Sequence, residues 1–189
     1  MSVVIAIKDK NKIVMGCDSQ STYGNIKSTL KGESTKIFEV KGLNKAYMGV
    51  VGSCRDSQLL SVSNKIVDPL ISVTNSTDYE WVVKCLYHSI YAILLENNRI
   101  EKDTNGNYVN STVNDYIFAH KDKAYFVSGV DGAVIEIDDY LVAGSGGEVA
   151  IGVLENNKGK PAEERIREAI KACADKTIYV DNNVIIKRT

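Results

Sequence analysis

The chain has 189 residues, of which 44% are hydrophobic and 25% are charged, and this suits one globular domain, residues 1–189, with a substantial core. Its 23 basic and 24 acidic residues leave a formal net charge of -1, which excludes the charge surplus typical of proteins that bind nucleic acid or anionic membranes. No apolar run suffices for a signal peptide or a membrane span. We therefore expect a cytoplasmic protein with neither partner.

The first part of the chain predicts two β-hairpins. Apolar runs at 3–7 and 12–17 are separated by a short polar turn, so the N-terminus lies within a sheet. The stretch 21–35 is polar, holds two glycines and is typical of a loop. Two further runs, 36–40 and 45–52, predict the second hairpin.

Two helices are predicted next. Apolar residues recur at helical spacing over 53–67, where Ser53 could cap the start and Pro69 stops the helix. The polar residues 76–78 precede a longer helix over 79–98. The apolar neighbours of His88 in this helix favour a packing role for that histidine.

The last part predicts three strands, two helices and two strands. After a polar break, a meander of short strands covers 115–120, 124–129 and 133–137. Helices at 148–157 and 161–176 and strands at 177–180 and 184–188 complete the chain. Strands and helices therefore come in blocks rather than in βαβ alternation, which favours an α+β fold: a four-layer αββα sandwich with two antiparallel sheets between helix layers.

Several chemical sites are excluded by spacing. The four cysteines, Cys17, Cys54, Cys85 and Cys173, form no CxxC pair, so neither a zinc site nor a dithiol redox site is indicated, and we expect them buried and reduced. The segment "AGSGG" lacks the first glycine of a nucleophile elbow, and both histidines of the chain precede it. An α/β-hydrolase triad is therefore excluded.

Ser2, which follows Met1, offers a different nucleophile. An α-amine on the same residue as the hydroxyl, with a reference pKa of about 7.7 to 8.0, is partly neutral near physiological pH and can accept the hydroxyl proton. A lysine such as Lys36 would favour the neutral amine and stabilise negative charge on the oxygen, while an aspartate such as Asp18 fixes that lysine. Backbone N–H groups in "MGVVGS" could form an oxyanion hole.

In these residues the sequence resembles the β subunits of the proteasome and their bacterial heat-shock peptidase relative of the HslV type, which are N-terminal nucleophile (Ntn) hydrolases. "SVVIAIKDKNKIVMGCDSQ" matches the start of the mature peptidase and places Ser2 at the catalytic threonine and Asp18 at the family's aspartate. "TKIF" places Lys36 at the catalytic lysine, and "GVVGSCRD" places the oxyanion-hole amide at Gly52. "AGSGG" makes Ser145 the serine that hydrogen-bonds the N-terminal amine.

The resemblance implies an Ntn-hydrolase fold and hydrolysis of polypeptide substrates through an acyl-enzyme. It also implies stacked rings of six or seven copies of the chain, with an AAA+ ATPase unfoldase as partner. No cofactor is required, although the carbonyls near Ala174, Thr177 and Val180 correspond to a loop that can hold a sodium or potassium ion in relatives. The positions that correspond to the family's substrate pocket are Ser21, Thr22, Ser34, Val50 and Cys54.

The sequence departs from the family's pattern at the nucleophile, where serine replaces threonine and loses the methyl group that restricts χ1. The proteasome's C-terminal aspartate position falls on Thr177, as it falls on a neutral residue in the bacterial peptidase. We expect no propeptide, so exposure of the Ser2 amine requires removal of Met1 only; with Met1 retained, the base is lost. Two alternatives stay open: a non-catalytic ring subunit, and an Ntn amidohydrolase acting on a small amide.

Overall fold

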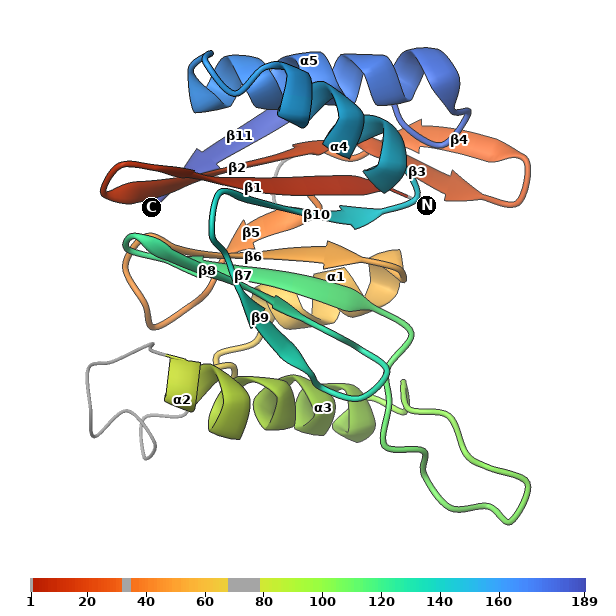
Figure 1. The fold of residues 1–189 in the computed structure, drawn as a ribbon. Helices are drawn as coiled ribbons and strands as arrows, with labels where there is room; N and C mark the ends of the chain where they lie inside the picture. The colour runs from red at the N-terminus through yellow and green to blue at the C-terminus, as the bar shows by residue number, and fades with distance from the viewer. Residues whose placement is uncertain (1, 32–34, 68–78) are drawn as a thin grey trace.

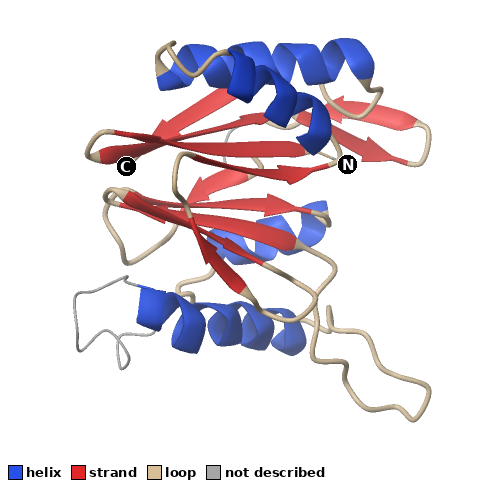
Figure 2. Ribbon diagram, in the orientation of Figure 1, coloured by secondary structure: helices blue, strands red, loops and turns tan. Residues whose placement is uncertain are grey.

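A computed structural model of the chain describes residues 2–31, 35–67 and 79–189. Two antiparallel sheets lie face to face, and helices cover the outer face of each, which makes four layers (Figures 1 and 2). The α+β sandwich expected from the sequence is therefore confirmed. Met1, Ser34, Pro69 and the segment 76–78 lie outside the described residues.

Antiparallel pairing joins all the strands within the sheets. The upper sheet of Figure 1 has the strand order β10-β1-β2-β11, and the lower sheet has the order β5-β6-β7-β8-β9. A separate hairpin joins β3 to β4. The strands are β1 (Val3–Asp9), β2 (Lys12–Asp18), β3 (Gln20–Tyr23), β4 (Ile26–Thr29), β5 (Ile37–Glu39), β6 (Ala46–Val51), β7 (Asp115–His120), β8 (Lys123–Val127), β9 (Val134–Glu136), β10 (Tyr140–Gly144) and β11 (Val184–Arg188).

The helices divide between the two outer layers. Those nearer the middle of the sequence cover the lower sheet, and the last two cover the upper sheet (Figure 1). The helical segments are α1 (Cys54–Val62), α2 (Tyr79–Trp81), the π-helical turn η2 (Val82–Leu86), α3 (Tyr87–Glu96), α4 (Gly147–Asn156) and α5 (Ala162–Lys176). Among the described residues, no helix combines the length and the apolar character that crossing a membrane requires.

Strand β1 shows why its sequence forms a central strand. Its residues Val3–Ile7 are fully buried, as expected for an apolar run with a sheet or a helix layer on both faces. Val3 and Ile5 pack in the core beneath α4 and α5, whereas Val4 and Ala6 pack in the core between the sheets. The alternation of a strand thus distributes one run of residues between two cores and fixes the position of the residue before it, Ser2.

Three predictions about strands are wrong or incomplete. The segment 177–180 is not a strand. Its Ile178 carbonyl accepts a hydrogen bond from the side chain of Gln20 rather than from a neighbouring strand. The stretch 21–35 is not a loop throughout, because the β3–β4 hairpin turns at Gly24, whose φ of 56° suits glycine. Strand β10 was not predicted; its short, half-buried sequence carries little alternation.

Two predictions about helices also need correction. Helix α1 ends at Val62 rather than at residue 67, because Ser63 is extended and its hydroxyl accepts a hydrogen bond from the Lys65 backbone N–H, a local turn that competes with the helix. The helix predicted over 79–98 contains a π-helical turn, and this wider turn shifts the buried stripe. His88 is consequently exposed and does not pack in the core.

The cysteines are all free, but only Cys17 and Cys173 are buried. Cys54 and Cys85 are half-buried, which corrects the expectation that all four lie inside. Desolvation by burial raises the pKa of Cys17 to about 12, and the same effect raises the pKa of Cys173 to about 11. Neither buried thiol is therefore a nucleophile at neutral pH.

Candidate active site

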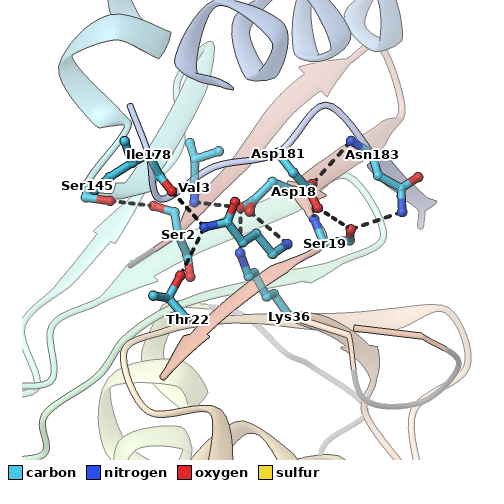
Figure 3. A network of polar contacts seen from close by, with 11 residues as sticks. Ser2, Val3, Asp18, Ser19, Thr22, Lys36, Ser145, Ile178, Asp181 and Asn183 are labelled. Atoms are coloured by element: carbon cyan, nitrogen blue, oxygen red, sulfur yellow. Dashed lines mark hydrogen bonds and ion pairs between the residues drawn. The ribbon is translucent and has the colours of Figure 1, made fainter. Parts of the chain in front are cut away.

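Asp18, the last residue of β2, binds three other segments of the candidate site. Its Oδ1 accepts hydrogen bonds from the Val3 backbone N–H at 3.0 Å and from Lys36 Nζ at 2.6 Å, and its Oδ2 accepts one from the Gln20 backbone N–H at 3.1 Å (Figure 3). The carboxylate is fully buried. Charge-assisted bonds of this kind are the strong ones, so Asp18 fixes both the start of β1 and the ammonium of Lys36.

Lys36 lies just before β5 in the lower sheet, whereas Asp18 belongs to the upper sheet. Their ion pair therefore bridges the two sheets at one end of the sandwich. Only 5% of Lys36 is exposed, and a buried cation of this kind is tolerated only with a partner that compensates its lost hydration. The sequence prediction that an aspartate would fix this lysine is matched by the 2.6 Å contact.

Ser2 lies immediately before β1 and is 6% exposed. The Ser145 hydroxyl donates a hydrogen bond of 3.4 Å to the Ser2 carbonyl oxygen (Figure 3); a bond from Ser145 to a free amine stays a prediction. Gly144 approaches the same carbonyl so closely that a Cβ there would lie 2.1 Å from it, and its φ is 106°. Only glycine fits at this point, and sequence reasoning did not single it out.

A cleft of about 70 Å³ opens beside Ser2. Its lining consists of Ser2, Gln20, Ser21, Thr22, Leu30, Lys36, Val50, Gly52, Ser53, Cys54 and Ser57. The structure thus brings Ser2, Lys36 and Gly52 together with all the described members of the predicted substrate pocket. Asp18 and Ser145 do not line the cleft but bind two residues that do, Lys36 and Ser2. The further lining residues Gln20, Leu30, Ser53 and Ser57 were not predicted.

Gly52 connects β6 to α1 at the edge of this cleft. Its φ of 137° is a conformation that other residues rarely adopt. Ser53 then caps α1 by accepting a hydrogen bond from the Asp56 backbone N–H on its hydroxyl. The start of a nine-residue helix therefore lies beside Ser2, and the helix dipole favours negative charge at this end.

The loop between α5 and β11 is tied to the segment that follows Asp18. The Asp181 carboxylate accepts hydrogen bonds from the Ser19 backbone N–H at 3.0 Å and from the Ser19 hydroxyl at 2.8 Å. Gln20 Nε2 donates to the Ile178 carbonyl at 2.8 Å and to the Thr22 hydroxyl at 3.0 Å (Figure 3). These ties were missed, because Asp181 reads in the sequence only as part of a turn.

The predicted cation position lies at the start of the same loop. Within the described residues, the buried hydroxyl oxygen of Thr177 has no hydrogen-bond partner. No group of three or more His, Cys, Asp or Glu side chains suited to a metal ion occurs in the part of the chain that the structure describes. An ion here would depend on neutral oxygens, which suits a monovalent cation better than zinc.

The sandwich, with a buried lysine–aspartate pair and a cleft at the start of its first strand, defines an Ntn-hydrolase fold. The proteasome subunit family matches this chain over residues 2–188, and the chain belongs to that family. Curated relatives include the ATP-dependent protease subunit HslV of Campylobacter hominis, which is 28% identical over 193 residues that cover 97% of this chain and 93% of the relative. The proteasome subunit beta of Nanoarchaeum equitans is 26% identical, with coverage of 90% and 80%.

Solved structures have the same fold. Thiobacillus denitrificans BPH in complex with epoxomicin superimposes with a TM-score of 0.75 at 17% identity, covering 99% of this chain and 97% of that one. Eukaryotic HslV from Trypanosoma brucei gives a TM-score of 0.65 at 17% identity, covering 98% of both chains. The fold match therefore extends over the whole sandwich.

Proposed function

We propose that this chain is an N-terminal serine peptidase of the HslV type that hydrolyses peptide bonds through an acyl-enzyme. The observation that carries the proposal is the buried Lys36–Asp18 pair, which shares one small cleft with Ser2 and Gly52. The relatives named as ATP-dependent protease subunits support the reaction class. The nucleophile becomes competent once Met1 has been removed, because only then does Ser2 carry a free amine.

In the proposed reaction the Ser2 hydroxyl oxygen attacks the carbonyl carbon of the scissile peptide while its proton passes to the α-amine of the same residue. The ammonium of Lys36 stabilises charge on the hydroxyl oxygen as it develops, and the Gly52 N–H donates to the oxyanion. The tetrahedral adduct collapses as the C–N bond breaks, and the proton returns from the α-ammonium to the leaving amine. Water then attacks the ester in the same way, which restores Ser2 and releases the acid.

Substrate selection is proposed to depend on the same cleft. Its predicted members among the described residues, Ser21, Thr22, Val50 and Cys54, contribute short side chains. A volume of about 70 Å³ admits a side chain of a few atoms. The substrate is a polypeptide in an extended conformation, delivered in the proposed assembly by an ATP-driven unfoldase.

A sodium or potassium ion at the carbonyls of Ala174, Thr177 and Val180 fits the residues present. The buried, unpartnered Thr177 hydroxyl, described above, supplies a further neutral oxygen at that loop. Such an ion, when bound, would be attracted to the partial negative charges of the carbonyl oxygens and would stabilise their arrangement in the loop. The loop itself holds the segment after Asp18 through the Asp181 carboxylate and the Ile178 carbonyl, whether or not an ion is bound.

The proposal is tested by intact mass together with reaction with a peptide epoxyketone, which requires both a free N-terminal amine and its hydroxyl. We expect a chain without Met1 that gains one adduct, and we expect Ser2→Ala to abolish the adduct. Protein from the natural host that retains Met1 and forms no adduct would refute the peptidase and favour a non-catalytic ring subunit. An adduct together with turnover of small amides but not of peptides would favour the amidohydrolase.

A further inference from the structure

A second buried polar network lies against the Gly52 turn and does not line the cleft beside Ser2. Asn114, which precedes β7, is 1% exposed, and its Oδ1 accepts a hydrogen bond of 2.6 Å from the Ser53 backbone N–H. A Cβ at Gly52 would lie 2.4 Å from the same oxygen. The Asn114 amide therefore lies directly against the Gly52–Ser53 peptide and limits the conformations that the turn can adopt.

The orientation of this amide is itself fixed. Asn114 Nδ2 donates to Asp56 Oδ2 at 3.0 Å and to the Tyr116 hydroxyl at 3.4 Å. Because both neighbours of the nitrogen accept hydrogen bonds, the oxygen of the amide is directed to Ser53. A flipped amide would place its oxygen against a carboxylate and leave the Ser53 N–H without an acceptor.

An ion pair between the buried Asp56 and the half-buried Arg99 anchors the network. Asp56 is fully buried, and its Oδ1 accepts a hydrogen bond of 2.5 Å from Arg99 Nε. Arg99 also donates to the Ser53 hydroxyl at 3.3 Å. The guanidinium therefore compensates the charge of the buried Asp56 carboxylate. It also binds the side chain of Ser53, whose backbone N–H is bound by Asn114.

We propose that Asn114 is a positioning residue for the oxyanion hole: it sets the Gly52–Ser53 turn so that the Gly52 N–H faces the Ser2 cleft, and Asp56 and Arg99 set the orientation of its amide. The inference rests on the proposed function, because it assigns a task to an amide of that site. Asn114 touches neither substrate nor nucleophile. It acts through the backbone that it holds.

The test compares Asn114→Ala with wild-type protein lacking Met1, using a fluorogenic peptide. Loss of one oxyanion donor costs about 10²–10³ in kcat, and misplacement of the donor is expected to cost about tenfold to hundredfold in kcat, with KM little changed. The affinity for a peptide boronate, which forms an anionic tetrahedral adduct, should fall in the same proportion. Binding of a product peptide, which forms no adduct, should not change.

The variant Asn114→Asp should change how kcat depends on pH, which a purely structural role of Asn114 would not do. The new carboxyl takes the place of the amide, whose nitrogen lies 3.0 Å from Asp56 Oδ2 and 3.4 Å from the Tyr116 hydroxyl. Arg99, the cation of this network, is bound to the other oxygen of Asp56. Two carboxylates this close do not both ionise readily, so one pKa is raised. Once protonated, the new carboxyl can donate to Asp56 and accept from Ser53, as the amide does.

The ratio of variant to wild-type kcat should therefore rise as pH falls from about 8 to about 6 for Asn114→Asp. The matched control is Asn110→Asp, an exposed position in the same segment, whose ratio should not change with pH. Should Asn114→Ala fail to fold, the pH ratio of Asn114→Asp decides alone. An unchanged kcat and boronate affinity in Asn114→Ala, or a flat ratio in Asn114→Asp, overturns the inference, whereas wild-type protein without turnover overturns the proposed function instead.

Discussion

At the scale of the residue, the buried pair of Lys36 and Asp18 makes two contributions that a single substitution cannot separate. Removal of Lys36 eliminates the charge proposed to support Ser2, but it also leaves a fully buried carboxylate without its cation. Breaking a buried ion pair from one side costs about 3–5 kcal/mol, whereas replacing both partners by neutral groups costs far less. Stability and activity should therefore respond differently to the single and the double change.

We expect Lys36→Met to lower the free energy of unfolding by about 3–5 kcal/mol and to abolish peptide hydrolysis. The double variant Lys36→Met with Asp18→Asn should regain part of that stability, because it removes the unpaired charge but keeps only one of the two oxygens that accept from the Val3 and Gln20 N–H groups. Hydrolysis should stay at least about 10²-fold below wild type. Urea unfolding and the rate with a fluorogenic peptide check the two quantities. Activity near the wild-type level in the folded double variant would contradict the role given to Lys36.

The buried thiol of Cys17 predicts a loss of stability in alkali. Burial raises its pKa from 9.0 to about 12, so above pH 9 the unfolded chain releases a proton that the folded chain keeps. This contribution to stability is fully present below pH 9 and is lost as pH rises toward 12. Between pH 8 and pH 10 wild-type protein should lose about 1.4 kcal/mol more than Cys17→Ala. Equal losses in chemical unfolding at the two pH values would refute this.

At the scale of the element, the loop between α5 and β11 is fastened to the segment between β2 and β3 through Asp181. Asp181→Ala leaves the N–H and hydroxyl of the buried Ser19 without their acceptor, which should cost about 1–3 kcal/mol. Amide hydrogen exchange at Ser19 and Gln20 should rise with it. Asp175→Ala, which removes an exposed carboxylate from α5, is the matched control. Equal stability of the two variants would show that the tie does not hold the segment.

The elements that the sequence could predict are those with a local pattern. The apolar runs and short polar turn predict the β1–β2 hairpin, and the spacing of apolar residues predicts α5. In both cases the residues that form the pattern are close together in the sequence. The π-helical turn has no such local signal in the sequence, although the residues Trp81 and Leu86 near its two ends are both buried in the core. Strand β10 depends on its partner, β1, which lies far away in the sequence.

The candidate site divides in the same way. Asp18, Lys36, Gly52 and Ser145 were found through resemblance to a family, whereas the residues alone gave only a chemical scheme. Contacts between distant parts of the chain were missed: Asp181 meets Ser19 across 162 positions. Pairings of this kind depend on how the layers of the fold stack, so the spacing of residues within a short stretch of sequence does not predict them.

At the scale of the whole molecule, the proposed ring requires several copies of the chain and therefore a surface on each copy that contacts its neighbours. Tyr23 and Ile26, at the tip of the β3–β4 hairpin, are 86% and 67% exposed, and exposed apolar side chains that lie together are typical of surfaces that a partner covers. We expect the protein to sediment as a multiple of 20.8 kDa that corresponds to one or two rings of six or seven copies. A strictly monomeric protein at assay concentration would contradict a compartmentalised peptidase.

The burial of Ser2 has a practical consequence for how the protein should be produced. Ser2 is 6% exposed, and its carbonyl is enclosed by Gly144 and Ser145, so an affinity tag fused to the N-terminus would both convert the amine into an amide and crowd the cleft. The two ends of the chain lie at opposite ends of the upper sheet (Figure 1). Under the proposed mechanism, a purification tag therefore belongs after Thr189, and protein tagged at the other end is expected to show no peptidase activity.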